Sequence, residues 1–375
     1  MKERGVNVDF HRMVRGFTLV ELLASLVILS ILLVLMVGAV SMTQGVWQRE
    51  TAKVEDYEQA RRAMDALASR IGEANLDGYW AYEVDEAGRD YYARASDGHF
   101  ISGEGSDLLG DSDVSSHALF FQCTRGISES GGSLGKLQFD GANALINATG
   151  FYVGYDTDVS YRPAFLSSHP QLHPLRGRFR LMEFCLPTEL TNLYSRGIGL
   201  NEPGTARESA LRWFRGPFQD GSRWQDHVKP VADNVLALIV APEWLQTVVT
   251  GSRTTSMPAK DFSYDTRQLQ WGEKTEQALA TQHQLPPRVR LILLVTDEKS
   301  YQKLEQTRGR AGAKETVFQA LASRFSVFSR LQGDLDAAEA ELMRAGLATR
   351  TFAMTVALRG SKWIIEKDLR ITDED

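Results

Sequence analysis

The chain has 375 residues, of which 43% are hydrophobic and 24% charged, and this composition is ordinary for a globular protein. A chain of this length can build one or two folded units. Its formal net charge of −6 argues against a non-specific nucleic-acid binder, because such a protein needs a basic face.

The first predicted element is a long apolar helix that follows a short basic leader. Residues 17–42 are mostly aliphatic, and as a helix they would measure about 39 Å against a hydrocarbon core of about 30 Å. The cations Lys2, Arg4, Arg12 and Arg15 precede this run, on the side that the positive-inside rule keeps in the cytoplasm. The pattern predicts one span in contact with membrane lipid, with the C-terminal part outside the cytoplasm.

Glu21 lies just inside the apolar run. A carboxylate in a membrane segment costs energy and is rarely retained without a partner, so Glu21 is a candidate functional residue. A secretory signal has an apolar region of only about 7–15 residues, shorter than this run. A plain signal anchor fits the length but explains neither Glu21 nor the glycine at Gly16, and a Glu21 that merely snorkels to the headgroups remains the alternative.

Residues 16–21, Gly-Phe-Thr-Leu-Val-Glu, resemble with their basic leader the N-terminal signal of type IV pilins and type II secretion pseudopilins. The resemblance implies that a prepilin peptidase cleaves between Gly16 and Phe17, that the Phe17 amine is N-methylated, and that an inner-membrane platform assembles the helix with other pilins or pseudopilins. Glu21 would then pair with the Phe17 amine of a neighbouring subunit and set the axial register. Many major pilins carry a proline where this chain has Gly38, which leaves local melting of the helix open.

Beyond the membrane the helix is expected to continue with one apolar stripe. Its apolar residues recur at spacings of three and four: Val54, Tyr57, Ala60, Met64, Leu67, Ile71 and Ala74. This periodicity predicts an amphipathic extension to Ala74 that stops near Asp77 and Gly78. The predicted organisation is therefore a leader (1–16), a membrane and filament-core helix (17–42), a helical extension (43–76) and an extracytoplasmic domain (77–375).

The extracytoplasmic domain is predicted to be α+β, with an antiparallel sheet packed on the long helix. Strands are expected at 117–123, 136–139, 148–155, 178–186, 234–240, 289–296, 350–358 and 363–365. Helices are expected at 188–196, 205–213, 313–324 and 333–345, with Asp334 capping the last. Residues 77–116 and 251–260 read as loops, the first with a short strand at 90–94.

The acidic residues of the first loop, Asp107, Asp111 and Asp113, match no EF-hand spacing, so a solvated loop is favoured over a calcium site. Cys123 and Cys185 each lie in an apolar, strand-like context outside the cytoplasm. A disulfide between neighbouring strands and two free buried thiols both remain open.

A second resemblance concerns the C-terminal half. A strand at 231–240, a loop with Trp271, and a Leu-Pro turn leading into a strand at 285–293 resemble the larger, J-type minor pseudopilins. The whole chain also resembles the prepilin-like cassette protein C family of verrucomicrobial genomes. The J-type resemblance implies a minor pseudopilin.

No catalytic constellation is recognisable in the sequence. The seven histidines form no HExxH motif, and there is neither a Gly-x-Ser-x-Gly elbow nor a phosphate-binding glycine loop. Trp213, Trp224, Trp244 and Trp271 are expected to be core residues more readily than a binding face. The sequence therefore predicts a non-enzymatic minor pseudopilin without metal or cofactor. An adhesive or ligand-binding pilin and a signal-anchored periplasmic enzyme are the alternatives.

Overall fold

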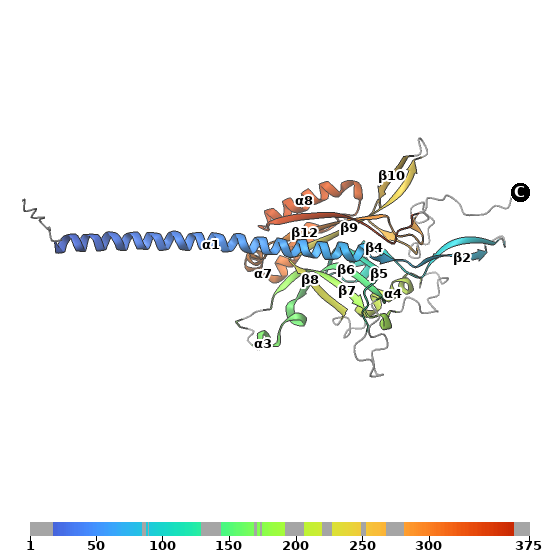
Figure 1. The fold of residues 1–375 in the computed structure, drawn as a ribbon, viewed down its shortest axis with the longest axis horizontal. Coiled ribbons are helices and arrows are strands. Elements are labelled where there is room, and N and C mark those ends of the chain that lie inside the picture. The colour runs from blue at the N-terminus through green and yellow to red at the C-terminus, as the bar shows by residue number, and fades with distance from the viewer. Residues whose placement is uncertain are drawn as a thin grey trace, which may run out of the picture. The chain divides into compact units, whose positions relative to one another are not determined.

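A computed structural model of the chain describes residues 18–84, 88, 90–128, 144–168, 171–172, 175–191, 206–219, 227–248, 253–267 and 281–363 (Figure 1). By its internal contacts the chain divides into unit 1, Met1–Glu55, and unit 2, Asp56–Asp375. Helix α1, Leu19–Gly72, runs through the boundary between these units. The remaining described elements belong to unit 2, which is α+β as the sequence predicts.

The part of α1 in unit 2 buries the predicted apolar stripe. Ala60, Met64, Leu67 and Ile71 are at most 3% exposed and form part of the main hydrophobic core. The helix ends at Gly72, slightly before the predicted end at Ala74, because the short strand β1, Ala74–Asn75, already pairs with another strand. Hydrophobic burial along one face, rather than helix propensity, therefore holds this part of α1 to the domain.

Unit 2 contains two sheets and a separate hairpin, with every strand pair in the described residues antiparallel. The seven-stranded sheet has the order β11-β4-β5-β6-β7-β8, with β1 also pairing β5. Its strands are β4 Ile101–Glu104, β5 Val114–Thr124, β6 Ile146–Thr157, β7 Gly177–Leu186, β8 Val228–Asp233 and β11 Tyr264–Asp265. The four-stranded sheet is β10-β9-β12-β13, formed by Arg253–Pro258, Val235–Val248, Arg288–Thr296 and Thr349–Ala357. The hairpin joins β2, Gly78–Val84, to β3, Asp90–Ser96.

Three consecutive side chains of β5 connect the two larger sheets. The Ser115 hydroxyl donates to the Leu236 carbonyl at 2.7 Å, and the Leu238 amide donates to the Ser116 hydroxyl at 2.9 Å. The Val240 amide donates to His117 Nδ1 at 3.1 Å. The register between β5 and β6 shifts at this point, and Ser116 has a positive φ of 57°, as expected for a bulge that redirects side chains.

The helices α7, Glu298–Leu321, and α8, Leu331–Arg344, follow β12. Asp297 caps α7 by accepting a hydrogen bond from the Ser300 amide at 2.8 Å, and Gly309 interrupts the helix with a φ of 74°. The prediction that Asp334 caps the last helix is wrong. Asp334 lies inside the first turn of α8 and accepts from the Phe325 amide at 3.1 Å, in the turn before the helix.

The short helical elements are α2 Gly105–Leu109, η1 Asp158–Tyr161, α3 Ala164–Ser167, η2 Thr188–Leu190, α4 Ala206–Gln219 and η4 Phe328–Arg330. The predicted helix at 205–213 corresponds to α4, and of the one predicted at 188–196 the described residues form only η2, a 3₁₀ turn.

Six predicted strands are confirmed as β5, β6, β7, β9, β12 and β13. The short strand predicted at 90–94 is confirmed as part of β3, but the two predicted loops are otherwise wrong. Residues 77–116 contain β2, β3, β4, α2 and the start of β5, and most of 251–260 is β10. The strand predicted at 136–139 lies outside the described residues. Of the strand predicted at 363–365, the structure describes only Trp363, which is not in a strand.

Candidate functional site

The candidate site inferred from the sequence is the N-terminal end of α1. Thr18 precedes the helix, and Glu21 Oε2 accepts hydrogen bonds at 3.0 Å from both the amide and the hydroxyl of Thr18. In return the Glu21 amide donates to Thr18 Oγ1 at 3.3 Å. This reciprocal arrangement is a capping box, which satisfies amides that the first helical turn leaves unpaired. The Thr-x-x-Glu spacing encodes it, and sequence reasoning missed it.

The capping box gives the Glu21 carboxylate a local partner at the positive end of the helix dipole. The carboxylate lies three residues after Thr18, so it is held at the same helix end as the predicted cleavage position. Gly16 and Phe17 themselves lie outside the described residues.

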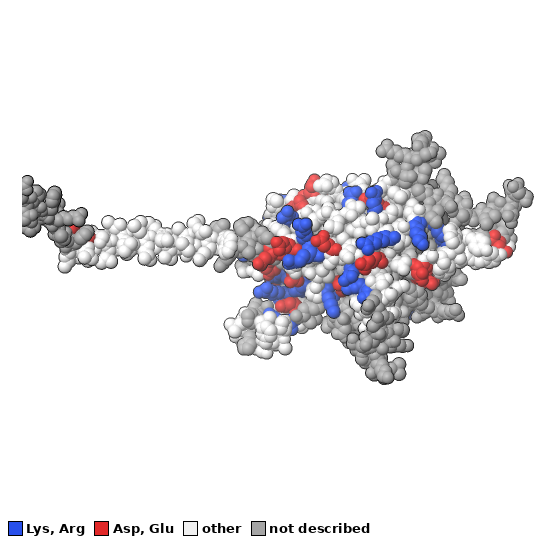
Figure 2. Space-filling model, in the orientation of Figure 1, with Lys and Arg blue, Asp and Glu red and all other residues white. Residues whose placement is uncertain are grey.

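The rest of the N-terminal helix is long and apolar enough to cross a membrane. Among the described residues this property belongs to one helix segment, Leu19–Gln44, with a mean hydropathy of 2.9. Figure 2 shows it without charged side chains after its first turns. The hydroxyls of Ser25, Ser30 and Thr43 donate to carbonyls of their own helix, so they do not present unpaired donors to lipid.

Gly38 lies in the C-terminal third of this apolar segment. A Cβ added there would meet no other atom within 4 Å in the described part of the chain. Packing within the monomer therefore does not require a glycine at this position.

Residues 11–37 match the family model described as the prokaryotic N-terminal methylation motif. The chain has a prepilin-type N-terminus. This motif implies processing by a prepilin peptidase, and together with the apolar helix it indicates an inner-membrane-anchored prepilin-like protein. Neither the curated proteins nor the solved structures contain a match to the chain.

The two cysteines lie on strands that are not neighbours. Cys123 on β5 is opposite Asn147, and Cys185 on β7 is opposite Thr149, with β6 between them. Next-nearest strands lie about 10 Å apart, whereas a disulfide requires Cα atoms within about 7 Å. Both thiols are free in the structure, which corresponds to the free-thiol alternative and not to a disulfide between neighbouring strands. Burial raises the pKa of the Cys123 thiol to about 11, so it is a poor nucleophile.

The described tryptophans that were expected in the core are buried there. Trp213 is 1% and Trp244 is 7% exposed, whereas Trp224 and Trp271 lie outside the described residues. Trp213 Nε1 donates to His99 Nδ1 at 3.0 Å, and His99 Nε2 lies 2.9 Å from Asp265 Oδ1. This His–Asp pair resembles part of a catalytic triad, but both residues are buried and both ring nitrogens of His99 are engaged by Trp213 and Asp265.

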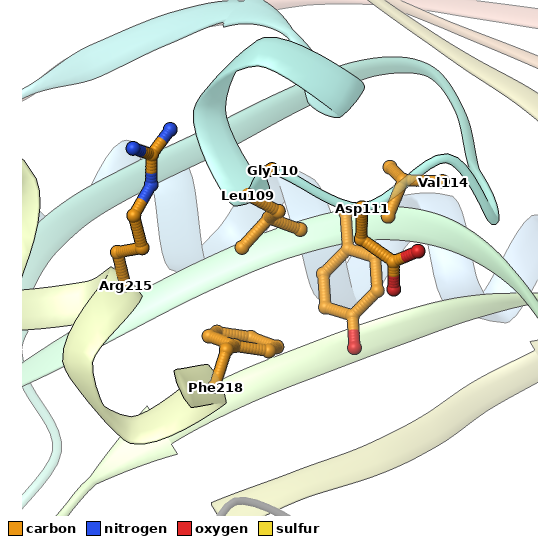
Figure 3. Close-up of a pocket in the computed structure, with 7 residues that line it drawn as sticks. Leu109, Gly110, Asp111, Val114, Arg215 and Phe218 are labelled. Atoms are coloured by element: carbon orange, nitrogen blue, oxygen red, sulfur yellow. The ribbon is translucent and has the colours of Figure 1, made fainter. Parts of the chain in front are cut away.

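A hollow of about 390 Å³ lies between α2, α4 and β6 (Figure 3). Tyr152 and Phe218 line it in an edge-to-face pair with ring centroids 5.6 Å apart. Arg215 and Asp111 lie on different sides of it (Figure 3). Arg215 donates to the carbonyls of Asp107 and Leu108 and thereby caps the end of α2. The hollow therefore does not bring an acid and a base together.

A second hollow, of about 260 Å³, is lined by Glu104, Asp107, Asp261 and His117 among others. His117 cannot act there as an acid–base group, because Nδ1 accepts from Val240 and Nε2 lies 2.9 Å from the Phe325 carbonyl. Burial lowers the pKa of His117 to about 4, so the ring is neutral near pH 7. In the part of the chain that the structure describes, no three His, Cys, Asp or Glu residues are placed to hold a metal ion.

Proposed function

We propose that the protein is a non-catalytic minor pseudopilin or pilin-like subunit that is cleaved between Gly16 and Phe17 and assembled through its N-terminal helix. The observation that carries the proposal is the methylation motif at residues 11–37 on an exposed apolar helix with a single carboxylate, Glu21. An ectodomain of this size is bulky for a densely repeated subunit, which favours a minor position at the filament tip, where there are fewer lateral neighbours.

Glu21 is proposed to set register by pairing with the methylated Phe17 amine of an adjacent subunit. Cleavage after Gly16 would create that amine one residue before Thr18, at the same helix end as the Glu21 carboxylate. Between packed apolar helices an unpaired charge is penalised, so the correctly staggered arrangement is the one in which both charges are partnered. The capping box holds the carboxylate at the helix end before assembly and reduces the cost of keeping it in the membrane.

The buried His99–Asp265 pair and the occupied His117 ring support a structural role over the alternative of a signal-anchored enzyme. In the second hollow both ring nitrogens of His117 are engaged, so this histidine cannot act as the base for the serines that line the same hollow. Filament neighbours and an inner-membrane assembly platform would be the partners of such a subunit, and the ectodomain would supply the specific contacts.

The decisive experiment is mass spectrometry of the mature N-terminus in the native host. We expect N-methylated Phe17 in the wild-type chain and an uncleaved chain in Gly16→Val. An intact Met1 in the wild-type chain, or a terminus near Met42, would refute the prepilin interpretation.

The role of Glu21 is tested with variants that separate capping from charge. Glu21→Gln retains a side chain that can complete the capping box, but it removes the negative charge. Thr18→Ala removes the hydroxyl of the box and retains the charge. We expect normal cleavage in both variants and loss of filament incorporation by about tenfold or more only in Glu21→Gln, as for a charged hydrogen bond of about 1.5–3 kcal/mol. Normal incorporation of Glu21→Gln would disprove the register role and leave the processing assignment intact.

A further inference from the structure

Exposed apolar side chains of unit 2 gather in two places that differ in charge. The first is the β2–β3 hairpin, where Tyr79, Trp80, Tyr82, Val84 and Tyr92 are exposed. Exposed acidic residues flank them: Asp77, Asp90 and Asp97. The second place is the connection between β6 and β7, where Val159, Phe165, Leu172 and Leu175 are 58%, 70%, 75% and 39% exposed.

The β6–β7 connection is fixed at its base and lies against α7. The Asp158 amide donates to the Arg176 carbonyl at 3.1 Å, and the Arg176 amide donates to Asp158 Oδ1 at 2.9 Å. Arg310 on α7 donates to the Leu175 carbonyl. The connection and the first half of α7 therefore adjoin at Leu175 and Arg310 and share one surface there.

The exposed charges on this surface are all positive. Among the described residues of 156–177 and 297–310, the exposed charged residues are Arg176, Lys299, Lys303, Arg308 and Arg310. The acidic residues there are buried or half-buried. Glu298 and Glu305 form ion pairs with Arg178 at 2.7 and 2.8 Å. Glu305 also pairs with Arg310, at 3.4 Å. The basic–apolar face is defined by these five cations and the four apolar residues, in a chain whose net charge is −6.

The basic–apolar face lies at the end of unit 2 where this unit's own segment of α1 begins. The ring of Tyr57, near the start of the α1 segment in unit 2, lies 6.2 Å from that of Phe352 on β13. At the same end of β13, Thr349 pairs with Thr296, the last residue of β12, and α7 begins at Glu298. Figure 1 shows α3 and α7 near this end of the unit.

We propose that the basic–apolar face docks on the surface of an anionic phospholipid bilayer, the membrane in which Leu19–Gln44 is inserted. Exposed Phe and Leu next to Lys and Arg are the combination that binds bilayer interfaces, with the apolar groups entering the headgroup region and the cations attracting anionic lipid. Residues 45–55 of α1 tether the face to the span with only about 17 Å of helix, so even a weak affinity acts at a high effective concentration. The proposal rests on membrane insertion of this helix and not on its cleavage.

The test uses the full-length chain in nanodiscs of phosphatidylcholine alone or with phosphatidylglycerol. A spin label is placed at Leu172→Cys in a chain with Cys123→Ala and Cys185→Ala, and its accessibility to oxygen and to a water-soluble nickel chelate is measured. We expect the label to become oxygen-accessible and chelate-protected in the phosphatidylglycerol discs. A label at Val84→Cys on the hairpin, exposed to 60%, should remain aqueous in both.

Charge-reversal variants supply the matched control. Lys299→Glu with Lys303→Glu should lower the ratio of docked to undocked label by at least about thirtyfold, because each lost cation removes a roughly fivefold preference and the new carboxylates are repelled by anionic lipid. Lys229→Glu with Lys260→Glu makes the same change in net charge at exposed positions outside the face and should leave docking unchanged.

Three results would overturn the proposal. These are a Leu172 label that is equally aqueous in both lipids, equal loss of docking in the two charge-reversal pairs, and protection of the label by self-association without anionic lipid. The Gly16→Val variant, which should not be cleaved, is expected to dock as the wild-type chain does. Failure of the processing assignment therefore does not affect this measurement.

Discussion

Acid should destabilise unit 2 through His117. Both ring nitrogens of this buried side chain are engaged, and Nδ1 accepts the Val240 amide, so a proton on Nδ1 would break that bond. The pKa falls from 6.5 to about 4 on folding, with burial as the main cause. Because the folded state binds the proton more weakly, the stabilisation is complete above about pH 6.5 and is lost as the pH falls towards 4.

The size of the effect follows from the same pKa. A group with pKa 6.5 unfolded and about 4 folded contributes about 2 kcal/mol less stability at pH 5 than at pH 7, and about 3 kcal/mol less at pH 4. The measurement is urea unfolding of the chain in detergent between pH 7 and 4, followed by the fluorescence of the buried Trp213 and Trp244.

Other groups also titrate in this range, so the comparison must be with a variant. Burial lowers the pKa of His283 to about 4 as well, and it contributes in the same direction. His117→Gln retains an amide that can accept and donate, but it has no proton to gain. Its loss of stability between pH 7 and 5 should be smaller than that of the wild-type chain by about 2 kcal/mol. An identical pH dependence in the two proteins would refute the reasoning, whatever their absolute stabilities.

Two further changes test the packing of unit 2 by the same unfolding measurement. Leu67→Ala removes a fully buried side chain of α1 and should cost about 2–5 kcal/mol, and a loss below 1 kcal/mol would contradict the assignment of this helix face to the core. Gly150→Ala should cost about 1–3 kcal/mol, because a Cβ there would lie 2.1 Å from Cδ1 of Phe120, which itself stacks on Phe214. Gly333→Ala is its matched control: it meets nothing within 4 Å inside α8 and should be neutral or stabilising by up to about 1 kcal/mol.

The features that the sequence predicted well are those encoded in short linear patterns. The stripe at Ala60, Met64, Leu67 and Ile71 was readable because helical periodicity and burial coincide there. The N-terminal signal could be recognised from the sequence because it is formed by contiguous residues, 11–37, and does not depend on the fold.

The errors arose where tertiary contacts decide the structure. The aromatic residues of β2 and β3 lie among Gly, Asp and Ser, and this composition indicated a loop although the two strands pair with each other. The strand β10 is held by its pairing with β9, and the local sequence pattern does not predict this pairing. The first half of α7 was not predicted as a helix because Gly309 and Gly312 follow it. The ion pair that holds its start, between Glu298 and Arg178, involves a strand that is distant in the sequence. The arrangement of Cys123 and Cys185 likewise depends on the order of strands, which spacing in the sequence does not reveal.

The two residues of β1 have a mechanical consequence. Immediately after Gly72 the chain pairs with β5, at Ala74 and Cys123, and β5 is bound by its side chains to the backbone of β9. A pull along α1, such as extraction of the helix from lipid would exert, is therefore shared between the buried face of the helix and a strand in the interior of the larger sheet. The helix cannot be separated from unit 2 without disrupting the hydrophobic core. Force applied to the helix is therefore transmitted to unit 2 as a whole.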